Sequence, residues 1–468
     1  MNKYLTFFQN KSWALFMAYI IISCALYSQV ISSPPIWDDH YFIFDFAPFQ
    51  SGLSYSEIWK NYAWPMTTTI HKFTLDLFGR HYSLYHLLNI IVHGLNCFLI
   101  FKIMKKMNLS YQIIVSFFFL IHPANLISVA WMIQIKTLLA FTFFSISLLC
   151  YLRFQDDKKF ISLIIGIPLF VLSLLTKSTA ILFPVALLFI HFSQKKMNLR
   201  LLIPIFLFTI LSLWGGIKLM GSPIVEKNQT VYAESITRRV EFAIQTIWYY
   251  LEQAFFPSNF TPVKGIFTSL DGFSLIALIL FLICIIVLLF LLQRTLGVAM
   301  IVALILMTPF LGIIKAPYMN VTSVSDQHLY LILPFFIWIF VCLGERIIFI
   351  FTNLDSPRAK IGGMIALCFF GSYFFSSTVL NSKIYQNEEN FYQTSLKYNP
   401  GNLFFYVNLA TYYQEQNNFE AAVETINKAI NYCQEHQELK NTQMYTLIGA
   451  KWFEIEQMAR KRKSLERN

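Results

Sequence analysis

The chain alternates between long apolar segments and short polar ones, and this pattern decides the class of protein. Residues 163–175 and 273–292 are almost entirely apolar, and a run of about 20 apolar residues crosses a lipid bilayer as a helix. The runs are continuous rather than alternating, which favours transmembrane helices over a transmembrane β-barrel. We predict an all-α, polytopic membrane helix bundle with about eleven helices. The predicted segments are 12–31, 84–104, 111–122, 132–152, 160–176, 179–193, 200–221, 273–292, 296–314, 328–350 and 361–381.

The polar connections predict the orientation of these helices. Connections after even-numbered helices are rich in Lys and Arg, as in KIMKKMN at 102–108 and SQKKMNLR at 193–200, and such residues accumulate on the cytoplasmic side. Connections after odd-numbered helices therefore face the other side, including a first outer loop at 32–83 and a second at 221–272. The first apolar segment is too long for a signal peptide and lacks a cleavage pattern before Pro34, so we interpret it as an uncleaved helix.

A polar C-terminal region follows residue 384, and we divide the chain into a transmembrane domain, 1–384, and a soluble tail, 385–468. The stretch LFFYVNLATYYQEQNNFEAAVETINKAINY at 403–432 has the packing pattern of a tetratricopeptide helix pair. The small side chains of Ala410 and Ala422 permit close helix approach, and Asn417–Asn418 predicts the turn. One such repeat cannot bury its own face, so we expect further helices at Phe391–Tyr398 and Met444–Met458 to pack on it.

Composition limits the class of protein and the kinds of partner that it binds. Of the 468 residues, 56% are hydrophobic and 13% are charged, which excludes a disordered chain and leaves too little charge for a soluble domain of this size. The net charge of +11 is explained by basic cytoplasmic loops, so we predict contact with membrane lipids and no nucleic-acid partner. Seven cysteines without a CxxC pair indicate packing residues rather than disulfides or a zinc site.

Candidate chemistry starts at IWDDHYFIFDF, residues 36–46, which places Asp38 and Asp39 beside His40 directly after the first helix. A lone Asp would most simply cap a helix or be solvated. This pair instead opens a long aromatic loop, and ionisable groups at a membrane boundary are costly and usually functional. The predicted topology gathers further polar residues on the same outer face: Arg80, His122, Lys136, Lys177, Asp326 and His328.

Several of these residues also have structural interpretations. Lys177 fits a lysine that extends from a helix end toward water. His122 precedes Pro123 and fits a helix stop with a fixed turn, and Asp326 fits a helix N-cap. We expect His86 and His93, on the second predicted helix, to be packed rather than ligating.

The order of motifs resembles the GT-C glycosyltransferases, and more closely the transmembrane-and-tetratricopeptide O-mannosyltransferases and their bacterial relatives. The resemblance extends over nearly the whole chain. Its segments are WDDHYFIFD, FGRHYSLYHLLNIIVHGLN, FFLIHPANLISVAWMIQIKTLLAFTFF, LLTKSTAILFPVALL, VSDQHLYLILPFF and the tail repeat.

This resemblance implies transfer of a sugar from a polyprenyl phosphate to a hydroxyl acceptor, with inversion at the anomeric carbon. A first-loop acid acts as general base, and we favour Asp38 over Asp39. The second acid then holds the acceptor, binds a divalent metal ion, or raises the pKa of its neighbour through like-charge repulsion. The departing phosphate requires cations or hydrogen-bond donors. The candidates for binding phosphate or substrate are His40, Arg80, His122, Lys136, Lys177, Asp326 and His328, with a divalent ion as another option.

The chain departs from the family pattern at several charges. Relatives commonly carry Arg at the position of Trp64, an acid near Ile127, Arg-Lys-Asp where this chain has Ile135–Lys136–Thr137, and Lys-Glu where it has Lys177–Ser178. These departures weaken the expectation of a metal site and are compatible with a different sugar or low activity.

Two classes of function follow. The first is an enzyme that glycosylates protein, or alternatively a lipid or polysaccharide, with the tail binding an acceptor peptide. The second is a membrane scaffold or transporter with a peptide-binding tail. We predict a bacterial inner membrane with the site on the periplasmic side; the alternative is the endoplasmic reticulum with a lumenal site.

Overall fold

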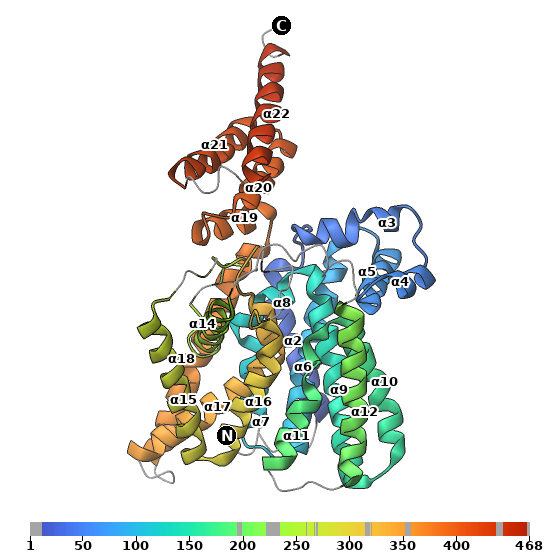
Figure 1. Cartoon of the computed structure of the whole chain (residues 1–468), viewed down its shortest axis with the longest axis vertical. Helices are drawn as coiled ribbons and strands as arrows, with labels where there is room; N and C mark the ends of the chain where they lie inside the picture. Colours follow the sequence, from blue (N-terminus) through green and yellow to red (C-terminus); the bar gives the residue numbers. More distant parts are fainter. Residues whose placement is uncertain are drawn as a thin grey trace.

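The structure is a computed structural model that describes residues 12–193, 199–220, 235–258, 260–265, 267, 270–313, 319, 321–351, 357–436 and 443–465. Within these ranges the regular elements are all helical, so the all-α prediction is confirmed for the described chain. The helices form a long bundle with a smaller helical unit stacked on one end (Figure 1).

Each of the eleven predicted apolar segments contains a helix. Among the described residues, four helices are long and apolar enough to cross a membrane, or up to six if each of two bent helix pairs counts as one span. The helices of the bundle are α2 (Ser12–Leu26), α6 (Tyr82–Lys106), α7 (Gln112–Ile121), α9 (Ile135–Asp157), α10 (Phe160–Thr176), α11 (Phe183–Ser193), α12 (Leu199–Met220), α15 (Gly272–Leu292), α16 (Arg294–Met307), α17 (Leu333–Phe351) and α18 (Pro357–Asn381).

The two bends interrupt apolar sequence at polar residues. Helix α7 and the segment Pro123–Ala130 meet at 54°, directly after His122. Helix α10 and the segment Ser178–His191 meet at 115°, and Lys177 lies in the break. The short elements η3 (Pro123–Asn125), α8 (Leu126–Ala130), η4 (Met132–Gln134) and η5 (Ser178–Ala180) fill these connections. At these breaks, backbone groups that are not used in helical hydrogen bonds are available to a binding site.

The first loop is itself largely helical. It contains a π-helical turn, η2 (His40–Phe44), followed by α3 (Ala47–Gln50), α4 (Tyr55–Asn61) and α5 (Pro65–Phe78). Ser54 and Glu57 form a reciprocal capping box at the start of α4, which satisfies backbone donors that a helix leaves unpaired. Helix α5 ends at Gly79, whose φ of +54° glycine adopts without strain.

The second predicted outer loop holds a helix that the apolar pattern did not reveal. Helix α14 (Ile236–Phe255) begins with a Ser235 cap and buries one face, including Phe242 and Tyr250. Its polar residues interrupt every long apolar run, so hydropathy alone did not detect it. Residues 221–234 of that loop lie outside the described part of the chain.

The tail consists of α19 (Glu388–Tyr398), α20 (Leu403–Glu415), α21 (Phe419–Glu435) and α22 (Gln443–Leu465). Ala410 and Ala422 are fully buried between α20 and α21, as their small size predicts. Asn417 turns the chain with a φ of +58°. The tail and the helices of the first loop lie at the same end of the bundle (Figure 1).

Candidate functional site

Asp39 is a buried anchor of the first loop. Its side chain is 1% exposed. One carboxylate oxygen accepts a hydrogen bond from the Ile36 amide at 3.0 Å, and the other accepts one from the Ile133 amide at 2.8 Å. Burial raises the pKa of Asp39 to about 8, opposed by these two amides. Because both oxygens bind backbone, Asp39 joins the first loop to the turn before α9.

Asp38 has a different environment. Its side chain is half-buried. Burial raises the pKa of Asp38, and Lys136 acts in the opposite direction. A carboxylate with a raised pKa beside a cation fits a general base better than the doubly bonded Asp39 does.

The residue before Asp38 is held by the tail. Trp37 has a φ of +45°, which is uncommon for a residue other than glycine. Its amide donates to Glu388 Oε1 at 3.1 Å. Its ring stacks on Trp131 at 5.7 Å between centroids and meets the edge of Phe405 at 4.8 Å. Contacts from α19 and α20 therefore fix the backbone that carries Asp38.

Two lysines from different segments lie in this region. Lys136 lies in the first turn of α9 and interacts electrostatically with both Asp38 and Asp39. Lys177 lies in the break after α10 and interacts electrostatically with Lys136. Its Nζ donates to Thr137 Oγ1 at 2.8 Å. Burial disfavours two neighbouring ammonium groups, and a bound anion would stabilise them.

His328 completes this arrangement, which we call the polar cluster (Asp38, Lys136, Lys177 and His328). His328 lies in η8 (Asp326–Leu331) and interacts electrostatically with both lysines. Its ring stacks on Phe310 at 4.2 Å, and Nδ1 is 3.3 Å from the Tyr250 hydroxyl. Four segments that are distant in sequence therefore contribute to one region.

Asp326 takes part in a separate ion pair. Its carboxylate is 3.3 Å from Lys264 Nζ and accepts a hydrogen bond from the Tyr249 hydroxyl at 2.5 Å. Asp326 makes no side-chain cap, so the N-cap interpretation is wrong. Asp326 therefore links η8 to Tyr249 of α14 and to Lys264, and not to Lys136 or Lys177.

His122 has a structural position. One ring nitrogen accepts from the Ala124 amide at 3.2 Å, and the other lies 3.1 Å from the Ala254 carbonyl. Both nitrogens are therefore occupied, and the ring is fully buried. His86 and His93 are buried as well, and His93 bridges the Tyr330 hydroxyl and the Leu120 carbonyl.

His40 and Arg80 form a surface group around Asp45. His40 Nδ1 lies 3.2 Å from Asp45, and Arg80 lies 2.8 Å from the same carboxylate. The Arg80 side chain is 58% exposed. This group lies at the end of the π-helical turn after Asp38, and Arg80 already has an acidic partner.

The donor set does not fit a divalent metal ion. Both Asp39 oxygens are occupied by backbone amides, and Lys136 is the cation beside Asp38. Among the described residues, no three His, Cys, Asp or Glu side chains group closely enough to hold a metal. The positive charge near Asp38 comes from lysines instead.

Trp64 and Ser178 contact each other. Trp64 Nε1 donates to Ser178 Oγ at 3.2 Å, and Lys177 Nζ donates to Thr137 Oγ1. In both contacts the acceptor is a neutral hydroxyl group.

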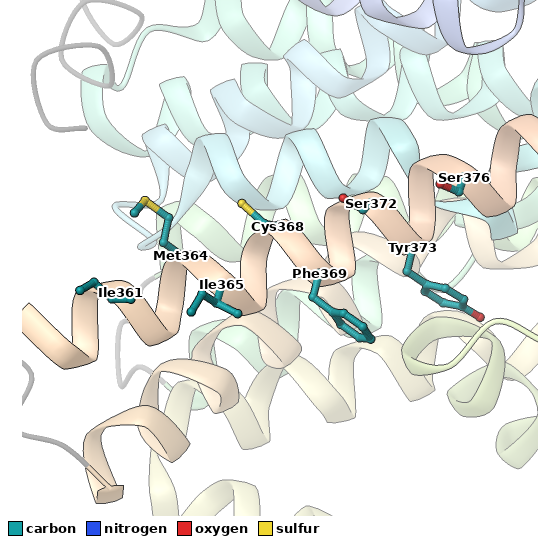
Figure 2. A pocket seen from close by; sticks show the side chains of 8 residues that line it. All are labelled: Ile361, Met364, Ile365, Cys368, Phe369, Ser372, Tyr373 and Ser376. Atoms are coloured by element: carbon teal, nitrogen blue, oxygen red, sulfur yellow. The ribbon is translucent and has the colours of Figure 1, made fainter.

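An open groove lies elsewhere, along α18. Figure 2 shows that its labelled side chains, from Ile361 to Ser376, all come from this one helix. Phe369 is 66% exposed, as expected for the outer face of a candidate membrane span. None of the predicted site residues lines this groove.

Comparison with known proteins identifies no relative of this chain. No family model, no curated protein and no solved structure matches the chain. The fold and the site define an all-helical protein with apolar helices compatible with a membrane and a polar cluster near one end of its bundle.

Sequence reasoning missed three residues close to this region: His71, Tyr250 and Glu388. Tyr250 and Glu388 hold His328 and Trp37 respectively. His71 is buried on α5 close to Lys136. None of the three lies in a quoted motif, and only the folded chain brings them close to the cluster.

Proposed function

We propose that this protein is a membrane glycosyltransferase that transfers a sugar from a polyprenyl-phosphate donor to a hydroxyl acceptor. The observation that carries the proposal is that Lys136 interacts electrostatically both with the half-buried Asp38 and with Lys177. A base next to a lysine, with a second lysine behind it, matches what the reaction needs at its two reacting ends. The resemblance of the motifs to GT-C enzymes agrees with this arrangement.

The reaction divides its tasks between these residues. The acceptor hydroxyl attacks the anomeric carbon while Asp38 takes its proton. The bond from that carbon to the phosphate oxygen breaks, and the electron pair leaves with the polyprenyl phosphate. Lys136 and Lys177 bind the phosphate as its negative charge grows. Attack opposite the leaving phosphate inverts the anomeric centre.

The remaining elements have supporting roles. The eleven helices form the GT-C-like membrane domain, with the polar cluster on the periplasmic side of a bacterial inner membrane. The tetratricopeptide-like tail binds a protein acceptor, since such helical pairs form concave peptide-binding surfaces. A lipid or polysaccharide acceptor would use the same chemistry.

The test is an activity assay on purified protein in detergent, with undecaprenyl-phosphate mannose or glucose and a threonine-rich peptide. Released undecaprenyl phosphate is the readout. Asp38→Asn should lower the rate roughly 100-fold or more, since general bases contribute about that factor. Thermal unfolding should remain close to wild type, because Asp38 accepts no backbone bond that anchors the loop.

Asp39→Asn should instead lower the unfolding temperature, since an amide can accept only one of the two backbone bonds without placing its own donor against an amide. Asp76→Asn is the matched control, an acid on α5 whose side chain is 46% exposed. Full activity of Asp38→Asn would contradict the proposal. Absence of phosphate release from the wild type with every donor would favour the scaffold alternative.

A further inference from the structure

Helix α5 contacts the break that carries Lys177. Trp64, directly before the helix, donates to Ser178, and the Thr67 hydroxyl donates to the Thr176 carbonyl. Thr67 and His71 are four residues apart and so share one helix face. His71 is 3% exposed and interacts electrostatically with Lys136.

The His71 ring has one occupied nitrogen and one free nitrogen. The ring forms a hydrogen bond with the backbone of Ile133 that raises the pKa of His71. A bond that raises this pKa stabilises the protonated ring, so the ring nitrogen is the donor. Nε2 is buried without a hydrogen-bond partner, which leaves Nδ1 as the donor. Burial and Lys136 outweigh that bond and lower the pKa of His71 to about 3. The ring is therefore neutral at ordinary pH, with Nε2 as an unprotonated acceptor.

A buried acceptor with no donor is rare in a folded protein and needs an explanation. An ionised phosphate cannot supply a donor, whereas a hydroxyl can. The ring interacts with Lys136 and bonds Ile133, whose amide binds Asp39, so this acceptor belongs to the same region as the proposed phosphate site.

We propose that Nε2 of His71 accepts a hydrogen bond from a substrate hydroxyl group bound next to the phosphate on the lysine pair. This inference rests on the proposed function and assigns a recognition residue that no motif contains. The hydroxyl belongs either to the donor sugar or to the acceptor, and the experiment separates these two sources.

Two substitutions separate substrate recognition from a merely structural role. His71→Asn places an amide near the Nδ1 position, so it can keep the bond to Ile133 but lacks the acceptor at Nε2. His71→Gln places an oxygen near the Nε2 position and loses the Ile133 bond. Recognition of a hydroxyl predicts that Gln works better than Asn, whereas a structural role predicts the reverse order.

The measurement is the affinity of the purified full chain for undecaprenyl phosphate and for undecaprenyl-phosphate mannose, by calorimetry in detergent. For a donor-sugar hydroxyl, His71→Asn should weaken binding of the mannose lipid roughly five- to tenfold, the value of one neutral hydrogen bond. Binding of the bare lipid phosphate should stay unchanged, and His71→Gln should remain near wild type. Lys136→Gln should weaken both lipids and serves as the matched control.

If the hydroxyl belongs to the acceptor, both lipid affinities stay unchanged in His71→Asn while the KM for a threonine-rich peptide rises by the same factor. Equal behaviour of Asn and Gln, or equal loss for both lipids, would overturn the role of His71 and leave the proposed function standing. A wild-type chain that binds neither lipid would overturn the proposed function, and this inference with it.

Discussion

Two neighbouring aspartates have opposite environments, which shows that residue type alone does not assign a role. Asp39 is fully buried and bonded to two amides, whereas Asp38 is half-buried and faces Lys136. Many sites for acid–base chemistry use two carboxyl groups in such different environments, one held by hydrogen bonds and one able to exchange a proton. The sequence supplied both acids and a narrow preference for Asp38, but only the contacts of Asp39 explain that preference.

The pH dependence of transfer tests the coupling between Asp38 and Lys136. Asp38 acts as a base when ionised, so the rate should rise with pH through the pKa of Asp38, which burial places above its ordinary value of 3.8. Lys136 lowers the pKa of Asp38. Lys136→Gln should therefore shift the midpoint of the pH–rate profile upward, as well as reducing the maximum rate.

The control is Lys60→Gln, at an exposed position on α4, which should leave the midpoint in place. A midpoint that stays constant or moves downward in Lys136→Gln would contradict the assigned pairing of Asp38 with Lys136.

At the scale of the element, the helix boundaries and the positions of the breaks were largely predictable, and the bend angles were not. Apolar length predicts α10 and α15 because burial in lipid requires about 20 apolar residues. At the 115° bend, Ser178 accepts a hydrogen bond from Trp64 at the start of α5, a contact between residues 114 positions apart. Helix α14 was missed because it is amphipathic. Its apolar face packs against neighbouring helices, so its sequence lacks the long apolar run of a lipid-facing helix.

The contact between Trp64 and Ser178 predicts a measurable coupling between α5 and this break. Trp64→Arg or Ser178→Glu alone introduces a partly buried charge and should destabilise the protein by about 1–3 kcal/mol. The double substitution places an Arg opposite a Glu and allows an ion pair between them. A double-mutant cycle on unfolding in detergent should give a favourable coupling of roughly 1 kcal/mol or more. Strictly additive effects would mean that the two side chains do not meet.

At the scale of the whole molecule, the two ends of the bundle differ in chemistry. The helices of the first loop and the tail share one end (Figure 1), and Asp39 binds the turn before α9. Lys106, at the end of α6, pairs with Asp156, near the end of α9. Helix α9 has 23 residues, about 34 Å at 1.5 Å per residue, so this pair lies far from Asp39. The basic residues predict that these two ends face opposite sides of the membrane.

Cysteine accessibility in cells tests which membrane side each end faces. In a background with the seven native cysteines replaced, Ser56→Cys on α4 and Glu420→Cys on α21 should react with a membrane-impermeant maleimide. Lys158→Cys, an exposed position after α9, should react only after the membrane is permeabilised. Labelling of positions 56 and 420 from opposite sides would exclude a shared compartment for the loop and the tail.

The sequence by itself determined the all-helical class, the positions of the apolar helices, the close α20–α21 pair and the presence of an acid pair in the first loop. These features are local, because hydrophobic length and small packing residues act over one or two helices. Tertiary structure alone decided which acid binds backbone and which is half-buried and interacts with Lys136, and which histidine lies buried close to that lysine. Those properties arise from contacts between distant segments and from burial. Neither the contacts nor the burial can be predicted from the order of residues along the chain.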